Sequence, residues 1–364
     1  MAAYRSIRDL DWGLVFTALI ICSIGVLQIY SATQDVEVWA SAWWKQILYV
    51  LIGVIFLWII ASIDYHTLLG QIPIIYISTI VLLLAVLIFG KSIAGARRWI
   101  QLPGFHLQVS EFAKLMIVLL VARFLTELRS DRVELRELLK LGALVALPWL
   151  LVMREPDLGT SLTYLPVLAV GVFLAGLRWR YILILAVVGV GVSWTAYHYV
   201  LQDYQKARIE SFLNPESDPR GSGYQVVQSK IAIGSGGMWG RGVTQGYQTQ
   251  LRFLPVPHTD FIFATYGEEH GFVGVVVLLV LYFGLLLQIV QNAQTAPDRA
   301  GMYICMGVAA LLLFHLLVNV GMVAGLMPVT GIPLPLMSSG GSNMLSTFLM
   351  LGLVNNVRLR RFVN

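Results

Sequence analysis

Residues 272–290 read FVGVVVLLVLYFGLLLQIV, a run without a charged side chain. A transmembrane helix needs roughly 20 apolar residues to cross the ~30 Å hydrocarbon core of a bilayer. The whole chain is similar in character, with 57% hydrophobic residues, 12% charged residues and a mean hydropathy of +0.75. This composition leaves too little polar surface for a soluble globular protein. The sequence therefore predicts an all-α, polytopic integral membrane protein.

Apolar runs on both sides of this one predict about ten transmembrane helices in a single membrane domain, 1–364. The clearest runs are 12–30, 43–63, 72–90, 181–200, 272–290 and 301–326, and shorter or more charged runs lie at 111–128, 138–153, 161–176 and 344–357. No small-residue cleavage site follows the first run, so we expect an uncleaved first helix. Cys22 and Cys305 lie inside apolar runs, and no disulfide is expected.

The distribution of Lys and Arg predicts the orientation, because short cytoplasmic loops carry an excess of these residues. On the ten-helix count, one side receives Arg5, Arg8, Arg129, Arg132, Arg136, Lys140, Arg178, Arg180, Arg299, Arg358, Arg360 and Arg361. We expect this side, with both termini, to be cytoplasmic. A long polar interruption at 202–263, between the seventh and eighth predicted helices, is then a large extracytoplasmic loop.

Asp260 lies where this polar interruption runs into the next apolar helix. A carboxylate at such a boundary is poorly solvated on one side, which raises its pKa toward the range of a general base. The alternative is an ordinary capping Asp at the start of a transmembrane helix. The same interruption contributes five candidates for a cationic funnel toward an anionic substrate, which are Lys206, Arg208, Lys230, Arg241 and Arg252. Within it, residues 224–233 are a candidate amphipathic segment at the membrane interface.

Several charges on the predicted outer side depart from the usual distribution. Arg97 and Arg98 stand beside Trp99 in a short loop, where two guanidinium groups match the oxygens of a lipid diphosphate. Snorkelling to anionic phospholipid is the alternative. Arg154 and Asp157 flank a tight turn at Pro156 and are candidate substrate or cavity residues. Either Asp157 or Thr160 is a candidate cap of the following helix, and Arg154 is a candidate partner for Glu155, Asp157 or Glu111.

Glu111 and Lys114 open another predicted span three residues apart, and this spacing places them on one helix face. Ionisable groups inside a span often mark a functional cavity, although a buried structural ion pair is the alternative. His258, Glu268, Glu269 and His270 lie near Asp260 in the sequence, but no metal-ligand spacing is present, so no protein metal site is expected.

Five motifs, in this order, resemble those of the SEDS family (shape, elongation, division and sporulation). They are GARRWI (95–100), SEFAK (110–114), EPDLGTS (155–161), PHTDFIF (257–263) and GIPLPLMSSGGS (331–342), and they span nearly the whole chain. The residues of the last two motifs are more similar to the elongation branch of the family than to the division branch. Val109 departs from the Pro that the family usually has before Ser-Glu, with little consequence expected.

The resemblance implies a peptidoglycan glycosyltransferase that polymerises lipid II on the outer face of the bacterial cytoplasmic membrane. It implies that Asp260 matches the family's essential acid, with undecaprenyl diphosphate as the leaving group, and that Glu111 and Lys114 match its intramembrane pair. The further candidate substrate or cavity residues inside the motifs are His258, Thr259, Ser338 and Ser339.

The implied partners are lipid II, the nascent glycan strand, membrane lipids and a class B penicillin-binding protein that supplies the transpeptidase. No nucleic acid is expected. Whether a divalent cation, Mg²⁺ or Mn²⁺, bridges the diphosphate stays open.

Two other functional classes fit part of the pattern. A lipid II flippase or transporter would also be polytopic, with an intramembrane ion pair and broken Gly/Pro segments. The position of the functional acid separates the two, because a transporter's acid belongs near the membrane midplane and Asp260 is predicted at the outer boundary. A pure scaffold for cell-wall enzymes does not explain the cations of the long loop.

Overall fold

The computed structural model describes residues 9–34, 36–93, 96–102, 105–128, 132–199, 201–218 and 221–361. Each of the ten predicted runs is helical. The helices are α1 (Trp12–Thr33), α2 (Ala42–Ser62), α4 (Ile72–Phe89), α5 (Val109–Thr126), α6 (Leu135–Arg154), α7 (Leu158–Leu162) followed by α8 (Tyr164–Leu174), α9 (Trp179–Tyr199), α13 (Ile262–Gln294), α14 (Arg299–Val323) and α15 (Gly341–Arg360). A short helix, α3 (Tyr65–Gly70), joins α2 to α4.

Six of these helices, α1, α2, α4, α9, α13 and α14, are long and apolar enough to cross a membrane. The prediction of a polytopic membrane protein is therefore confirmed, while the count of ten crossings stays a prediction.

Several helices begin at the side-chain caps that the sequence provides. Asp11 accepts a hydrogen bond from the Leu14 amide at 3.2 Å, and Asp298 accepts one from the Gly301 amide at 2.7 Å.

The centre of the bundle is formed by α14 and α15. Helix α14 packs against α13, α5 and α8, while α15 packs along α2. The α2–α15 contact depends on small residues, since a Cβ on Gly352 would lie 2.8 Å from the Leu57 carbonyl oxygen and a Cβ on Gly53 would lie 2.4 Å from the Phe348 ring. Close backbone approach of this kind is how helices in lipid gain packing contacts.

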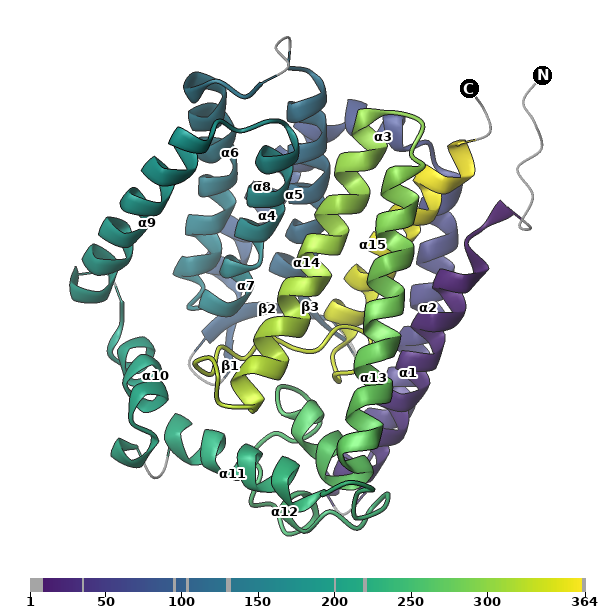
Figure 1. Ribbon diagram of the computed structural model, residues 1–364, viewed down its shortest axis with the longest axis vertical. Helices are drawn as coiled ribbons and strands as arrows, with labels where there is room; N and C mark the ends of the chain where they lie inside the picture. The colour runs from purple at the N-terminus through teal and green to yellow at the C-terminus, as the bar shows by residue number, and fades with distance from the viewer. Residues whose placement is uncertain are drawn as a thin grey trace.

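Two segments at one end of the bundle have more structure than the sequence predicted. The segment before α5 forms a three-stranded antiparallel sheet of β1 (Lys91–Ile93), β2 (Ala96–Leu102) and β3 (Phe105–Gln108). The long polar interruption contains the helices α10 (Asp203–Leu213), α11 (Ser222–Ser235) and α12 (Tyr247–Gln250), with a 3₁₀ turn at Pro215–Ser217. The sheet and α10 to α12 lie at the same end, as Figure 1 shows.

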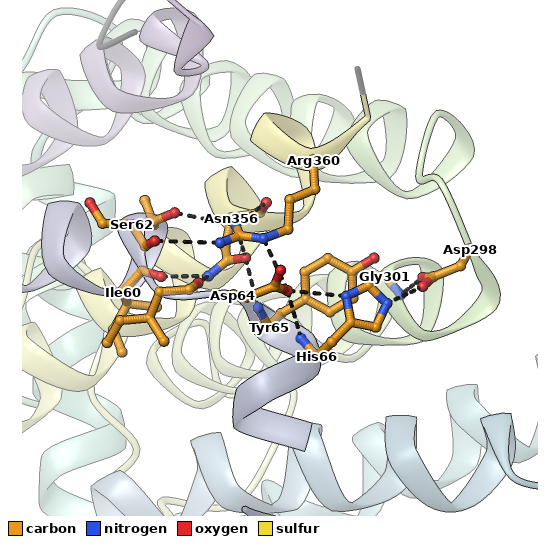
Figure 2. Close-up of polar contacts among 11 residues, drawn as sticks. Ile60, Ser62, Asp64, Tyr65, His66, Asp298, Gly301, Asn356 and Arg360 are labelled. Carbon is orange, nitrogen blue, oxygen red and sulfur yellow. Dashed lines mark hydrogen bonds and ion pairs between the residues drawn. The ribbon is translucent and has the colours of Figure 1, made fainter. Parts of the chain in front are cut away.

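At the opposite end, the first turn of α1 and the last turn of α15 lie close together (Figure 1). Asp11 and Arg358 form an ion pair there at 2.9 Å. Next to this pair, Asn356 and Arg360 of α15 bond to carbonyl groups at the end of α2, and His66 lies between Asp64 and Asp298 (Figure 2). This polar cluster joins α2, α3, α14 and α15.

Candidate active site

Asp260 lies just before α13 and is held by a second chain segment, residues 331–339. The side-chain amide of Asn319 donates to the Asp260 carbonyl at 2.9 Å and to the Ile332 carbonyl at 2.8 Å. Ser338 Oγ donates to the Thr259 carbonyl at 2.7 Å, and the Ser339 amide donates to the His258 carbonyl at 3.0 Å. Four of the predicted site residues, His258, Thr259, Ser338 and Ser339, therefore fix the backbone around Asp260.

The Asp260 side chain lies against a glycine. Gly331 has φ 73°, a left-handed conformation that favours glycine, and a Cβ at this position would lie 3.3 Å from Asp260 Oδ2. Burial raises the pKa of the half-buried Asp260 above its ordinary value, and Asp157 adds to this effect, while the positive charges of Arg208 and Arg98 oppose it. Asp260 is therefore a carboxylate with reduced solvation that faces two cations.

Arg98 and Asp157 meet at the turn between α6 and α7. The Arg98 guanidinium lies 3.6 Å from Asp157 Oδ1 through Nη1, donates from Nε to the Glu155 carbonyl at 3.3 Å and also donates to the Pro156 carbonyl. Asp157 in turn caps α7 through the Thr160 amide and accepts from Gln108 Nε2 at 2.8 Å. The predicted capping role of Asp157 is confirmed.

Arg154 makes none of the three candidate ion pairs. It is the last residue of α6, its side chain is exposed, and it contacts none of Glu155, Asp157 or Glu111 in the described part of the chain. Arg98, from β2, takes that place because the sheet folds back over the α6–α7 turn. The backbone of Arg97 pairs with Ser92, and its side chain lies outside the described part of the structure.

Glu155, in the same turn, is a buried acid that the sequence did not single out. It has no exposed surface, and neither carboxyl oxygen has a hydrogen-bond partner among the described residues. Burial, with the nearby charge of Asp157, raises the pKa of Glu155 to about 8, against the opposing effect of Arg98. Glu155 is therefore largely protonated at neutral pH.

Glu111 and Lys114 form the buried ion pair that their spacing predicts, with Lys114 Nζ 2.8 Å from Glu111 Oε1. Lys114 Nζ also lies 3.1 Å from Nε2 of His315, whose Nδ1 lies 3.1 Å from the Pro333 carbonyl oxygen. Because a carbonyl oxygen only accepts, Nδ1 carries the proton and Nε2 accepts from Lys114. The pair is thus connected to the segment that holds Asp260.

Sequence reasoning missed His315 and Asn319, which both lie on α14 with one helical turn between them. Each is a buried polar side chain inside an otherwise apolar helix. This contrast in polarity was the available signal, because polar groups inside transmembrane helices usually have a bonding partner or a function. Both side chains bond to carbonyl groups of the segment 331–339, His315 to Pro333 and Asn319 to Ile332.

His258 contacts a residue of the α1–α2 connection. Its ring centroid lies 4.5 Å from that of Trp39, and burial lowers the pKa of His258 to about 4, so that it is neutral. Beside it is a cavity of ≈160 Å³. Its lining includes Trp39, Arg252 and Pro257. Arg252 is thus the one predicted loop cation among the described residues that borders this cavity.

Two more of the predicted loop cations, Arg241 and Lys230, lie apart from Asp260. Arg241 donates to the Ser235 carbonyl at 2.8 Å and lies over the Tyr247 ring, and Lys230 projects from α11 across Gly325. Neither contacts Asp260 within the described ranges. Of the five predicted loop cations, Arg208 acts on Asp260 electrostatically, together with Arg98 of β2. The predicted funnel is therefore incomplete.

The sequence considered Glu268 and Glu269 only as metal ligands. Glu268 fastens the long segment to α13, and Glu269 joins α13 to α1. Glu268 accepts from the Gln248 amide at 2.8 Å and from Thr249 Oγ1 at 2.9 Å. Glu269 accepts from Gln28 of α1 at 3.0 Å and from Ser31. Among the described residues, no group of three or more His, Cys, Asp or Glu side chains is arranged to hold a metal ion.

The chain matches the family described as "Cell cycle protein" (FtsW/RodA/SpoVE) over residues 11–361. It is 34% identical to the peptidoglycan glycosyltransferase RodA of Treponema pallidum, with 98% of this chain and 99% of that protein covered. It is 38% identical to the peptidoglycan glycosyltransferase MrdB of Escherichia coli (strain K12), with 96% and 92% covered.

Among solved structures, a chain of a peptidoglycan synthase complex, described as coordinating polymerization and crosslinking, superposes with a TM-score of 0.82. That chain is 35% identical, and the match covers 98% of this chain and 99% of that one. The rod shape determining protein RodA of Thermus thermophilus superposes with a TM-score of 0.72 at 30% identity, covering 97% and 98%.

Proposed function

The chain belongs to the FtsW/RodA/SpoVE family, and we propose that it is a peptidoglycan glycosyltransferase that joins lipid II units into glycan strands during cell elongation. The relatives that carry this activity in their names match nearly the whole chain. The observation that carries the mechanism is the position of Asp260, a poorly solvated carboxylate with two arginines within electrostatic reach.

Asp260 acts as the general base. It takes the proton from the acceptor sugar hydroxyl as that oxygen attacks the anomeric carbon of the donor, which inverts the configuration there. The bond to the undecaprenyl diphosphate breaks with its electron pair on the diphosphate. A raised pKa suits this role, because a base is most effective when its pKa approaches the working pH.

The leaving diphosphate gains negative charge as the glycosidic bond breaks, and fixed cations nearby stabilise that charge. Arg98 and Arg208 are the described cations that act on Asp260, and Arg97 neighbours Arg98 on β2. Two of the three bonds that orient the Arg98 guanidinium are to backbone carbonyls, which leaves its positive charge only partly neutralised.

A divalent cation, Mg²⁺ or Mn²⁺, would have to take most of its ligands from the diphosphate itself. The described carboxylates near Asp260 are Asp157, which is engaged with Arg98 and Gln108, and Glu155, whose raised pKa makes it a weak ligand. Divalent ions commonly bind phosphates with few protein ligands. Polymerisation with and without added Mg²⁺ or Mn²⁺ tests this point.

The active site belongs on the extracytoplasmic side of a bacterial cytoplasmic membrane. The end of the bundle away from Asp260 carries Arg132, Arg178, Arg180, Arg299 and Arg358, which the positive-inside rule assigns to the cytoplasm. The first turn of α1 and the last turn of α15 lie at that end (Figure 1), which supports a cytoplasmic position for both termini.

A transpeptidase of the class B penicillin-binding proteins is the expected partner, because a glycan strand must be cross-linked as it is made. A solved relative is a chain of a peptidoglycan synthase complex that combines polymerization and crosslinking. Copurification of the chain with the transpeptidase of its own cell tests this partnership.

A lipid II flippase is the alternative function, and the position of the ion pair argues against it. Glu111 and Lys114 lie in the first two turns of α5, which begins directly after β3 at the Asp260 end. At 1.5 Å per residue, Lys114 is roughly 8 Å from the start of the helix. The buried charges are therefore near the outer end of the bundle, whereas transporter sites lie near the midplane.

The decisive experiment uses the purified full-length chain and purified lipid II. Asp260→Asn keeps the shape of the side chain but cannot accept the proton, so polymerisation should fall by roughly 10²- to 10⁴-fold. Asp203→Asn, at an exposed position of α10 at the same end, should polymerise as the parent does. Near-parental activity of Asp260→Asn would contradict its role as the base. A parent chain that moves lipid II across vesicles without polymerising it would support the flippase.

A further inference from the structure

A cavity of ≈740 Å³ lies at the end of the bundle away from Asp260. It is lined by Arg132, Gly176, Leu177, Arg178, Trp179, Arg180, Tyr181 and Ile184. We call it the arginine cavity. Arg132 comes from the α5–α6 connection, and the other residues come from the α8–α9 turn and the first turns of α9. None of the lining residues is acidic.

The lining combines three kinds of group that suit one type of ligand. The planar guanidinium groups of the three arginines match phosphate oxygens. Trp179 and Tyr181 are residue types that gather at the level of lipid headgroups. Leu177 and Ile184 give the cavity an apolar side. The ligand that fits is a phosphate attached to an apolar body.

Helix α9, which begins at this cavity, indicates where the apolar body of the ligand lies. No described side chain of α9 is buried, although α9 is apolar and long enough to cross a membrane. A helix that packs on a neighbour buries a stripe of side chains on one face. Among the described residues of α9, only Tyr181 in its first turn packs against the hydrophobic core, and it is only partly buried. Figure 1 shows α9 at the margin of the bundle.

We propose that the arginine cavity binds the phosphate of an anionic glycerophospholipid of the cytoplasmic leaflet, and that the acyl chains of this lipid lie along the inner face of α9. The arginines lie at the first turn of α9, and the remainder of this helix is apolar. The lipid therefore binds with its phosphate at the start of α9 and its acyl chains toward the other end. This site lies in the opposite leaflet from the site of glycan transfer and takes a different lipid.

A topology signal is the competing explanation for these arginines. Such a signal depends on positive charge in the loop and tolerates Lys in place of Arg. A built phosphate site depends on the guanidinium geometry, so Arg178→Lys with Arg180→Lys should weaken it while the orientation of the chain stays the same. Arg136 provides a matched control, because it is an exposed arginine on α6 at the same end and does not line the cavity.

The test is native mass spectrometry of the full-length chain in a neutral detergent, titrated with phosphatidylglycerol or with phosphatidylcholine of the same acyl chains. We expect one phosphatidylglycerol to bind preferentially. Arg178→Gln with Arg180→Gln should weaken its binding roughly a hundredfold or more, as expected from the loss of two charge-assisted hydrogen bonds. The double Lys variant should lie between this variant and the parent, and Arg136→Gln should match the parent.

A second measurement uses only the parent chain, so its outcome does not depend on whether the variants fold. The melting temperature of the parent should rise with phosphatidylglycerol and stay unchanged with phosphatidylcholine or inorganic phosphate. The same rise with inorganic phosphate would identify a free-anion site and overturn the lipid proposal. Equal binding of the two lipids, or an equal loss of binding in Arg136→Gln, would also overturn it.

Discussion

At the scale of single residues, the candidate site contains more carboxyl groups than its chemistry uses directly. Asp260 faces cations and is partly solvated, whereas Glu155 is fully buried without a hydrogen-bond partner among the described residues. Two carboxyl groups in one region thus have their pKa values raised by burial, one of them to about 8. A carboxyl group that stays protonated beside Asp157 and Arg98 limits the net negative charge near the diphosphate.

Glu155 gives the chain a specific dependence of stability on pH. Its folded-state pKa of about 8 lies above the ordinary value of 4.5, so the folded state binds more protons than the unfolded state between these values. Stability therefore falls as the pH rises through this range and levels off above about 8. One pKa unit corresponds to roughly 1.4 kcal/mol, so the total effect is on the order of a few kcal/mol.

We expect Glu155→Gln to remove this slope and to raise the melting temperature most at alkaline pH. The measurement is the melting temperature in detergent from about pH 5 to about pH 9. Glu37→Gln, at an exposed position of the α1–α2 connection, should leave the slope unchanged. Parallel curves for the parent and Glu155→Gln would show that Glu155 is ionised in the folded state.

Arg98 has a structural role and a proposed substrate role, and kinetics separate them. Lys retains the charge but lacks the planar fork of separated donors with which Arg98 reaches both carbonyls of the turn and Asp157. We expect Arg98→Lys to raise KM for lipid II roughly tenfold, which corresponds to the loss of one charge-assisted hydrogen bond. Asp157→Asn loosens the same turn without removing a cation. If the two variants have equal KM values, Arg98 only holds the turn.

At the scale of elements, α14 links the buried ion pair of α5 to the segment that holds Asp260. His315 accepts from Lys114 and donates to Pro333, and Asn319, one turn further along, donates to Asp260 and Ile332. The Glu111 carboxylate is also bonded by Ser346 of α15 at 3.3 Å. The pair is therefore part of a network in which each charge has a neutral partner of its own.

This network predicts the outcome of exchanging the two charges. Removing either Glu111 or Lys114 strands a buried charge, at a cost of about 3 to 5 kcal/mol. The exchange Glu111→Lys with Lys114→Glu restores the pair but places a carboxylate against the accepting Nε2 of His315. We expect it to recover only part of the lost melting temperature and polymerisation rate. Complete recovery would mean that His315 does not bond to Lys114, and additive single effects would mean that the pair does not interact.

At the scale of the whole molecule, the two ends of the bundle are fixed by different means. The Asp260 end consists of connecting segments bonded to one another, while the opposite end is closed by the polar cluster of Figure 2. There Asn356 is fully buried, donates to the Ile60 and Ile63 carbonyls and accepts from the Tyr65 amide at 3.2 Å. Arg360 adds an ion pair to Asp64 at 3.1 Å.

Asn356→Ala should therefore destabilise the whole bundle and leave the chemistry of the Asp260 end intact. It strands the Tyr65 amide and two carbonyls, and each buried unpaired group costs roughly 1 to 3 kcal/mol. We expect a lower melting temperature with near-parental kcat at low temperature. Gln294→Ala, exposed near the same end, should change neither quantity. A loss of kcat without a loss of stability would contradict this division between the ends.

The sequence by itself determined the features that depend on local pattern. Apolar runs of membrane length gave the ten helical segments, and a spacing of three residues placed Glu111 beside Lys114, because contacts within one helix follow from its period. The family motifs gave the activity, because they are read directly from the chain.

Tertiary structure alone decided which distant residues meet. Arg98, and not Arg154, pairs with Asp157, and His315 reaches Lys114 across 201 positions of the chain. Within 202–263 only the segment at 224–233, which lies in α11, was predicted, while α10, α12 and the sheet before α5 escaped prediction. Their partners lie on other segments, and packing between segments is not encoded in the local period of either one.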